Sequence, residues 1–294
     1  MPSPSPYAAL LARVPRQERT RSVLGSDTHV VEYGPADAAV TVVVVHGFRG
    51  DHHGLEPVVA HLGEVRILAP DLPGFGLSAP LVGRPHDIAG YAAWLRAFLE
   101  AEGVAGTAVL LGHSFGSIVV SAAVAAGVET PRVVLINPIG APALSGPRGV
   151  LTRAAVAFYR VGAALPARLG FGVLRSRLVT RVMSVSMAKT QDRELRRWIH
   201  AEHDRYFSGF ANRDMLLEAF RASVSHDVSE FAADVSAPTL LIAAVDDDIT
   251  PIEAQRRLVT LFPDAELVEI AHVGHLIHYE TPEAAATAIR EFLA

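Results

Sequence analysis

The sequence predicts an α/β fold: a mostly parallel central sheet with helices on both faces and one helical insertion. Strand-like and helix-like segments alternate in the first half of the chain and again at its end. Residues 39–47 form a continuous β-branched run, which is typical of a strand buried on both faces. Residues from 141 to about 235 contain helical stretches without a convincing strand. We therefore expect a core of residues 1–140 and 236–294 and a cap of residues 141–235.

The elements of the first half follow one another in short order. Residues 1–20 are expected to form a short frayed tail, and the alternating residues 28–34 a partly exposed antiparallel edge strand. The helix expected at 87–103 ends in glycine, a typical stop signal. Further strands are expected at 39–47, 64–74 with its turn, 107–112 and 132–140. Further helices are expected at 55–63 and from the end of the 107–112 strand to about residue 126.

After the insertion the alternation resumes. Strands are expected at 238–245 and 265–271, and helices at 252–262 and 282–294. Strands that alternate with helices pair in parallel through crossover connections. Their carboxyl ends then meet at one edge of the sheet.

Composition excludes several classes of protein. Half of the 294 residues are hydrophobic and 19% are charged, so the chain can bury a large core. The net charge of −5 gives no reason to expect a nucleic-acid partner. The absence of cysteine excludes disulfides, cysteine nucleophiles and thiolate metal sites. The N-terminus resembles no secretory signal and no run is apolar for long enough to span a membrane, so we expect a cytoplasmic protein.

The stretch LLGHSFGSIVV places Ser114 between an expected strand and an expected helix. Such a turn forces the serine into a strained backbone conformation, and Gly112 and Gly116 remove the side chains that would clash there. The turn lifts the hydroxyl above the carboxyl edge of the sheet, at a helix N-terminus that favours negative charge. This context predicts that Ser114 is a nucleophile.

A serine hydroxyl needs a base, and the base needs an orienting acid. Among the histidines near the last strand, His275 is favoured because it follows a glycine in a loop at the same sheet edge as Ser114. His272 lies closer to the strand end, and His278 lies near a helix start, where a surface role is ordinary. The acid is expected among residues 246–248, three aspartates that directly follow a strand.

These residues resemble a serine hydrolase of the α/β-hydrolase superfamily, of the esterase and lipase kind with a helical cap. The order serine, aspartate, histidine is that of the family, and the resemblance covers the chain except the insertion. It implies that Asp247 is the acid, because the family's acid commonly stands four residues before a proline, here Pro251. It further implies that the backbone N–H groups of Phe48 and Phe115 hold the oxyanion, and that Asp71 shapes a loop.

Five side chains are candidates for a substrate pocket: His46, Arg49, His113, Phe158 and Phe171. His46 is expected to brace its loop instead of transferring protons. No cofactor and no metal are expected. In GDHHG (50–54), Asp51 is expected to cap a helix that carries exposed histidines. Residues 246–248 lack the glycine-punctuated loop of a calcium site, and GFGLS is too short for a dinucleotide loop.

The first half of the insertion is basic. Residues 141–190 contain no acidic residue, and arginine stands at positions 148, 153, 160, 168, 175, 177 and 181. One interpretation is a cap with its apolar face on the core and its arginines in water. The alternative is a lid that makes weak contact with an anionic lipid surface. Its larger apolar residues are expected to line an acyl pocket.

The resemblance and the three candidate residues together predict a cofactor-free serine hydrolase. Its expected substrate is a small carboxylic ester with an apolar acyl or alcohol part, cleaved through an acyl-enzyme intermediate. One alternative is a carbon–carbon bond hydrolase of a diketone, in which Arg49 would hold a substrate carboxylate. The other is a catalytically silent relative that binds a ligand.

Overall fold

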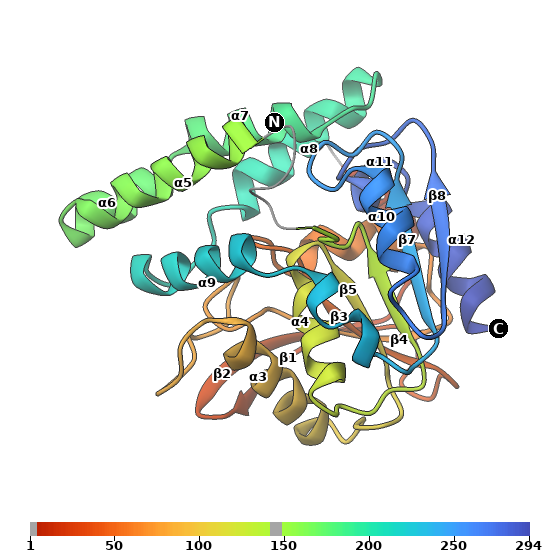
Figure 1. Ribbon diagram of the computed structural model, residues 1–294. Coiled ribbons are helices and arrows are strands. Elements are labelled where there is room, and N and C mark those ends of the chain that lie inside the picture. The colour runs from red at the N-terminus through yellow and green to blue at the C-terminus, as the bar shows by residue number, and fades with distance from the viewer. Residues whose placement is uncertain (1–4, 142–148) are drawn as a thin grey trace.

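An eight-stranded sheet forms the centre of the molecule (Figure 1). The computed structural model describes residues 5–141 and 149–294. The strands lie in the order β1-β2-β4-β3-β5-β6-β7-β8; β1, β2 and β4 pair antiparallel, and the remaining pairs are parallel. The strands are β1 (Arg16–Val23), β2 (Ser26–Tyr33), β3 (Thr41–Val45), β4 (Arg66–Pro70), β5 (Val109–His113), β6 (Val133–Ile136), β7 (Thr239–Ala244) and β8 (Ala265–Ile270).

Helices cover both faces of this sheet and bury one apolar cluster on each. The cluster on one face includes α3 and α4, and the cluster on the other includes α2 and α12. The mostly parallel sheet with helices on both faces confirms the predicted fold class. Outside the insertion the helices are α1 (Ala8–Leu11), the 3₁₀ turn η1 (His52–Leu55), α2 (Glu56–Ala60), α3 (Ile88–Ala101), α4 (Phe115–Ala125), α10 (Ile252–Val259), α11 (Ile277–Glu280) and α12 (Pro282–Leu293).

The central strands are buried because their sequences are apolar without interruption. All residues of β5, β6 and β7 are buried. Strands of this kind need helices on both faces, since neither face can be left in water. The carboxyl ends of β3, β5, β6 and β7 therefore form a rigid edge on which loop residues can be positioned.

The prediction for the N-terminus was wrong. Residues 16–20 are part of β1, and β1, not β2, is the edge of the sheet. The sequence of β1 (RQERTRSV) contains a single apolar residue, Val23, so no apolar alternation was visible. Its stability comes partly from charge: Arg19 bridges Glu32 on β2 and Glu102 after α3.

The helix expected at 55–63 is shorter in the structure, and a 3₁₀ turn precedes it. A 3₁₀ turn starts at His52, and α2 ends at Ala60. Asp51 caps this turn as predicted, because its carboxylate accepts a hydrogen bond from the N–H of His53 at 3.0 Å.

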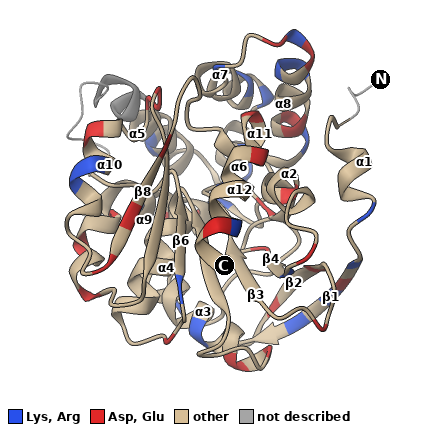
Figure 2. Ribbon diagram, turned by 90° about the vertical axis from the view of Figure 1, so that its right-hand side faces the viewer, with Lys and Arg blue, Asp and Glu red and all other residues tan. Residues whose placement is uncertain are grey.

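A helical insertion separates β6 from β7. Its helices α5, α6, α7 and α8 lie together at one end of the molecule (Figure 1), and Figure 2 shows α5, α7 and α8 at the same end. Among the described residues, no helix is both long and apolar enough to cross a bilayer. The helices of the insertion are α5 (Gly149–Ala164), α6 (Ala167–Leu174), α7 (Arg177–Met187), α8 (Arg193–Tyr206) and α9 (Arg213–Ser225), followed by 3₁₀ turns at Val228–Glu230 and Ala232–Asp234.

Candidate active site

Ser114 stands between β5 and α4 in a backbone conformation that side chains rarely adopt. Its φ is 51° and its ψ is −117°. A Cβ added to Gly112 would lie 2.5 Å from the carbonyl oxygen of Gly116, and one added to Gly116 would lie 2.1 Å from that of Val45. Only glycine fits at either position. The two glycines therefore permit the sharp turn because they have no side chain that would clash, as the sequence suggested.

Ser114, His275 and Asp247 are in hydrogen-bonding contact although they are far apart in the sequence. Nε2 of His275 lies 2.9 Å from Oγ of Ser114, and Nδ1 lies 2.8 Å from Oδ2 of Asp247. A carboxylate only accepts hydrogen bonds, so Nδ1 carries the proton and Nε2 accepts from the serine hydroxyl. The structure thus brings together all three residues that the sequence selected.

The environment of Asp247 favours the ionised carboxylate. Its Oδ1 accepts hydrogen bonds from the N–H groups of Ile249 (2.7 Å) and Thr250 (3.1 Å), and its Oδ2 accepts from the Thr250 hydroxyl at 2.6 Å. Burial opposes ionisation, but the interaction with His275 and these hydrogen bonds hold the pKa of Asp247 below its usual range. A permanently charged acid can orient His275 and stabilise its protonated form.

The two neighbouring aspartates have different surroundings. Asp246 is exposed, and Asp248 forms an ion pair with Lys189 of the insertion. Neither has a hydrogen bond to His275. Of the three acidic residues, only Asp247 has its side chain in the buried position next to the histidine.

Asn137 supports the loop that carries His275. Its Nδ2 donates to the carbonyl of His275 at 2.9 Å, and its Oδ1 accepts from the N–H of Ala244 at 2.9 Å. The residue is fully buried and has a φ of 43°. It therefore ties the His275 loop to the end of β7, three residues before Asp247. Sequence analysis missed Asn137, although a polar residue directly after an apolar strand at this edge was a usable signal.

The predicted oxyanion donors lie on both sides of Ser114. Phe115 is the first residue of α4, where N–H groups have no acceptor within the helix. A Cβ added to Gly47, which precedes Phe48, would lie 3.4 Å from Cβ of Ser114, so this loop packs directly on the serine. Within the described residues, the backbone N–H groups of Phe48 and Phe115 donate to no protein acceptor.

His46 braces this loop, as predicted. Its Nδ1 donates to the carbonyl of Gly47 at 2.8 Å, and its Nε2 accepts from the N–H of Leu72 at 2.8 Å. Both ring nitrogens are therefore engaged with the backbone. Burial lowers the pKa of His46, which keeps the ring neutral.

His113 and His278 form a buried pair next to the candidate base. Their ring centroids are 4.2 Å apart, and that of His113 is 5.7 Å from that of His275. Burial, with a smaller effect of His275, lowers the pKa of His113 to about 3. The surface role expected for His278 was wrong, because α11 turns its side chain into the core; His272 is exposed.

Arg49 connects the loop after β3 to the insertion. It is 1% exposed, and its guanidinium donates to the hydroxyl of Tyr159 (3.1 Å) and to the carbonyls of Leu174 (2.9 Å) and Phe207 (3.0 Å). These carbonyls belong to the C-terminal ends of α6 and α8, where the helix dipoles are negative. The two helix ends therefore compensate the buried charge without a carboxylate.

The two remaining candidate pocket residues are half-buried in the insertion. The ring of Phe158 packs edge-on against that of Tyr159, at a centroid distance of 5.4 Å. The ring of Phe171 packs edge-on against that of Phe210, also at 5.4 Å. Both contribute to the apolar cluster that includes α3 and α4.

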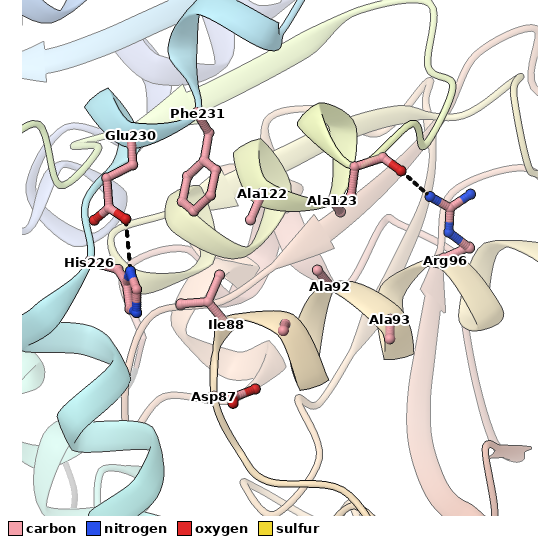
Figure 3. A pocket seen from close by; sticks show the side chains of 12 residues that line it. Asp87, Ile88, Ala92, Ala93, Arg96, Ala122, Ala123, His226, Glu230 and Phe231 are labelled. Atoms are coloured by element: carbon pink, nitrogen blue, oxygen red, sulfur yellow. Dashed lines mark hydrogen bonds and ion pairs between the residues drawn. The ribbon is translucent and has the colours of Figure 1, made fainter.

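Two surface cavities of the described residues contain none of the predicted site residues. One of about 500 Å³ lies between α3, α4 and the segment after α9 (Figure 3), and one of about 390 Å³ lies beside α1. Alanine side chains form much of the first cavity, and an ion pair of His226 with Glu230 lies at its side. Among the described residues that line these cavities, no hydroxyl forms a hydrogen bond with a histidine, whereas Ser114 does so with His275.

The histidines of GDHHG were expected to be exposed, but His52 is buried. Its Nδ1 lies 2.8 Å from Oδ1 of Asp71, whose Oδ2 accepts from the N–H of Leu77 at 2.9 Å. With His29, these two residues place ligand-type atoms within 4.8 Å of one another, so the group could hold a metal. The hydrogen bonds of Asp71 are those of a residue that shapes its loop; they counteract its burial and lower its pKa to about 2.

Comparison with known proteins identifies the family. Residues 42–288 match the alpha/beta hydrolase family. A putative carbamate hydrolase RutD from Caulobacter sp. (strain K31) is 25% identical over 271 residues, which cover 90% of this chain and 95% of that protein. Lipase LipV from Mycobacterium tuberculosis is 36% identical over 123 residues, which cover 42% of this chain and 45% of that protein.

Solved structures of esterases share the fold. A thermophilic esterase from Thermogutta terrifontis has a TM-score of 0.74 at 24% identity, with 94% of this chain and 98% of that chain covered. The naproxen esterase of Bacillus subtilis has a TM-score of 0.73 at 18% identity and full coverage of both chains. The family match over most of the sequence and the common fold lead to one conclusion: this chain is a hydrolase that belongs to the alpha/beta hydrolase family.

Proposed function

We propose that the protein is a serine esterase that cleaves carboxylic esters with an apolar acyl or alcohol part through an acyl-enzyme intermediate. The observation that carries the proposal is the hydrogen-bonded series from Ser114 Oγ to His275 Nε2 (2.9 Å) and from His275 Nδ1 to Asp247 Oδ2 (2.8 Å). Residues 141–235 act as the cap of a core formed by residues 1–140 and 236–294. No cofactor takes part.

In the first half of the reaction, Nε2 of His275 takes the proton of the Ser114 hydroxyl while Oγ attacks the carbonyl carbon. The negative charge that develops on the carbonyl oxygen is held by the backbone N–H groups of Phe48 and Phe115, which have no other acceptor among the described residues. Asp247 stabilises the imidazolium. His275 then donates its proton to the leaving alcohol as the carbon–oxygen bond breaks.

In the second half, His275 takes a proton from water, which attacks the acyl carbon of the intermediate. Collapse of the second tetrahedral species breaks the bond to Ser114 Oγ, and Nε2 returns the proton to that oxygen. The acid is released and the starting state is restored. Asp247 keeps its charge throughout, in agreement with the lowered pKa of its carboxyl.

The substrate class follows from the surroundings of the loop after β3. The ring of Phe48 lies among the rings of Phe75, Phe115, Tyr159 and Phe220, at centroid distances of 5.8 to 6.1 Å. These buried rings give the loop of Phe48 an apolar environment, which supports an apolar acyl or alcohol part. The RutD relative is named a putative carbamate hydrolase, and a carbamate carbonyl can be attacked by the same groups. A carbamate ester therefore belongs in the substrate panel.

The carbon–carbon bond hydrolase is the weaker alternative. It used Arg49 to hold a substrate carboxylate, but the guanidinium is occupied by Tyr159 and by the ends of α6 and α8. The silent ligand-binding relative would not require an ordered contact of serine with histidine and aspartate. Both alternatives remain outcomes of the experiment below.

The test combines labelling with kinetics. A fluorophosphonate should label Ser114, and Ser114→Ala should lose label and lower ester turnover by roughly 10⁴-fold or more, since residues of a triad act as a unit. Ser186→Ala, an exposed serine on α7, is the matched control and should behave as wild type. Turnover of an unactivated diketone in preference to every ester would favour the carbon–carbon bond hydrolase. Absence of labelling in the folded wild type would favour the catalytically silent relative that binds a ligand.

The acyl preference is measured with the same protein. Across acetyl to decanoyl esters, kcat/KM should rise with chain length, because each buried methylene contributes about 0.8 kcal/mol. A flat or falling series would contradict the apolar pocket and leave the serine mechanism intact.

A further inference from the structure

Helix α7 of the insertion has polar residues at its fully buried positions and three large apolar residues on its exposed face. Its two buried residues are Thr180 and Ser184, and its exposed face carries Leu178, Val182 and Val185, which are 73%, 62% and 59% exposed. Their spacing of four and three places the three apolar residues in one stripe along the helix. A cap helix of a water-soluble domain is expected to show the opposite arrangement.

Polar contacts hold the inward face in place. Oγ of Ser184 lies 2.6 Å from Nδ1 of His200 and 2.7 Å from Nδ1 of His203, both on α8. Oγ1 of Thr180 lies 3.4 Å from Oγ of Ser208. These hydrogen bonds fix the rotation of α7 about its axis. The apolar stripe is therefore a stable feature of the surface.

Two other helices of the insertion also carry exposed apolar side chains. Val161 on α5 is 54% exposed and Leu169 on α6 is 62% exposed. With the α7 stripe, they make up five of the eleven large apolar side chains that are exposed in the described part of the chain. We call these five residues, Val161, Leu169, Leu178, Val182 and Val185, the outer apolar face.

Exposed arginines accompany the outer apolar face. They are residues 160, 168, 175, 177 and 181, and no acidic residue occurs between positions 141 and 190. Arg181 pairs with Asp204 of α8, and Arg175 lies 5.3 Å from the ring centroid of Phe171. The chain as a whole has a net charge of −5, so this cationic region stands out against an acidic protein.

We propose that the outer apolar face of the insertion docks on an anionic lipid surface. Apolar side chains in one stripe with cations beside them are the composition of a helix that lies in the plane of a membrane interface. The apolar residues enter the headgroup region, and the arginines bind the lipid phosphates. A second copy of this chain fits less well, because a two-fold contact would bring the same arginines together.

The insertion is linked to the segments on both sides of the candidate active site. Arg49 links the insertion to the loop of Phe48, and Lys189 links it to Asp248 beside the acid. The insertion therefore lies against the sheet edge that carries Ser114, and a bound lipid surface would lie on the outer side of α7. The docking proposal does not depend on the esterase activity and is tested without it.

The experiment is co-sedimentation of the full chain with vesicles of phosphatidylglycerol and phosphatidylcholine in equal amounts, at low salt. The wild type should sediment with these vesicles, and binding should weaken at about 0.5 M NaCl, where charges are screened. The triple variant Leu178→Ser, Val182→Ser, Val185→Ser should bind at least about tenfold more weakly. Its circular dichroism and thermal midpoint should remain those of the wild type, since all three side chains are exposed.

A matched control carries serine at exposed apolar positions outside the insertion, Val82→Ser with Leu261→Ser, and should bind as wild type. Three results would overturn the proposal. They are absence of binding by the wild type, equal binding to pure phosphatidylcholine, and equal loss in the control variant. A wild-type dimer that the triple variant converts to a monomer, without vesicle binding, would assign the face to a second copy.

Discussion

Helices α4 and α7 have the same length of 11 residues and opposite burial. In α4, ten consecutive residues from Phe115 to Val124 are buried; in α7, only Thr180 and Ser184 are. Helix α4 is packed between β3, β5 and α3 and holds the N–H group beside Ser114. Helix α7 is held by hydrogen bonds of its buried Thr180 and Ser184 and exposes Leu178, Val182 and Val185.

The difference shows that apolar residues have separate tasks in the two regions. Around α4 they position the reacting groups, because a close-packed interior leaves little freedom. On α7 they contribute little to folding, since surface that stays in water gives no hydrophobic stabilisation. Mutations at the sheet edge should therefore change activity and stability, whereas mutations on the outer apolar face should change neither.

The largest effect is expected at the sheet edge. Asp247→Asn should lower kcat/KM by roughly 10³- to 10⁴-fold, because the amide would hold His275 in the wrong tautomer. Asp246→Asn and Asp248→Asn are the controls and should stay within tenfold of wild type. Steady-state kinetics with one ester substrate is the measurement. A strong loss in the Asp248 variant instead would mean that the Lys189 ion pair, and with it the insertion, controls the chemistry.

A matched pair of valines tests the comparison directly. Val119→Ala in α4 should lower the free energy of unfolding by about 2–4 kcal/mol, because it leaves a cavity in the core. Val182→Ala on α7 should change it by less than about 0.5 kcal/mol, since the side chain is 62% exposed. Urea unfolding of both variants gives the two values. Similar losses would show that α7 is packed against a partner surface in solution.

Acid should lower the stability of both the sheet and the insertion, because each contains a buried histidine. His113 on β5 and His203 on α8 are each buried, and burial lowers the pKa of each to about 3. Between pH 6.5 and pH 3 the unfolded chain binds a proton that the folded chain does not, so stability is complete above pH 6.5 and is lost as the pH falls. At pH 5 each histidine should cost about 2 kcal/mol.

Unfolding measured at pH 7 and pH 5 checks this expectation. His113→Asn and His203→Asn should each reduce the acid loss by a similar amount, because His203 packs against Tyr279 of α11 and unfolds with the core. If only the His113 variant reduced the loss, the insertion would open independently of the sheet.

Much of the fold could be predicted because its signals are local. A continuous β-branched run identified β3, an apolar run identified β7, and the glycines at 112 and 116 identified the turn at Ser114. The strand β1 was missed because its stabilising partners, Glu32 and Glu102, come from other elements. The interior positions of His52 and His278 were missed for the same reason, since burial depends on what packs against a side chain.

The sequence by itself determined the α/β fold and the candidate catalytic residues Ser114 and His275, because backbone propensity and the order of polar residues after strands are contained in short stretches. It also narrowed the acid to three adjacent aspartates. The family resemblance implied Asp247, and the tertiary structure shows that this aspartate contacts His275. Only the tertiary structure decided that Asn137 ties the histidine loop to β7 and that two helix ends accept the hydrogen bonds of Arg49. It alone decided which side of α7 faces water. A helical repeat shows that a helix has two faces, but the direction in which each face points is set by the elements that pack against it.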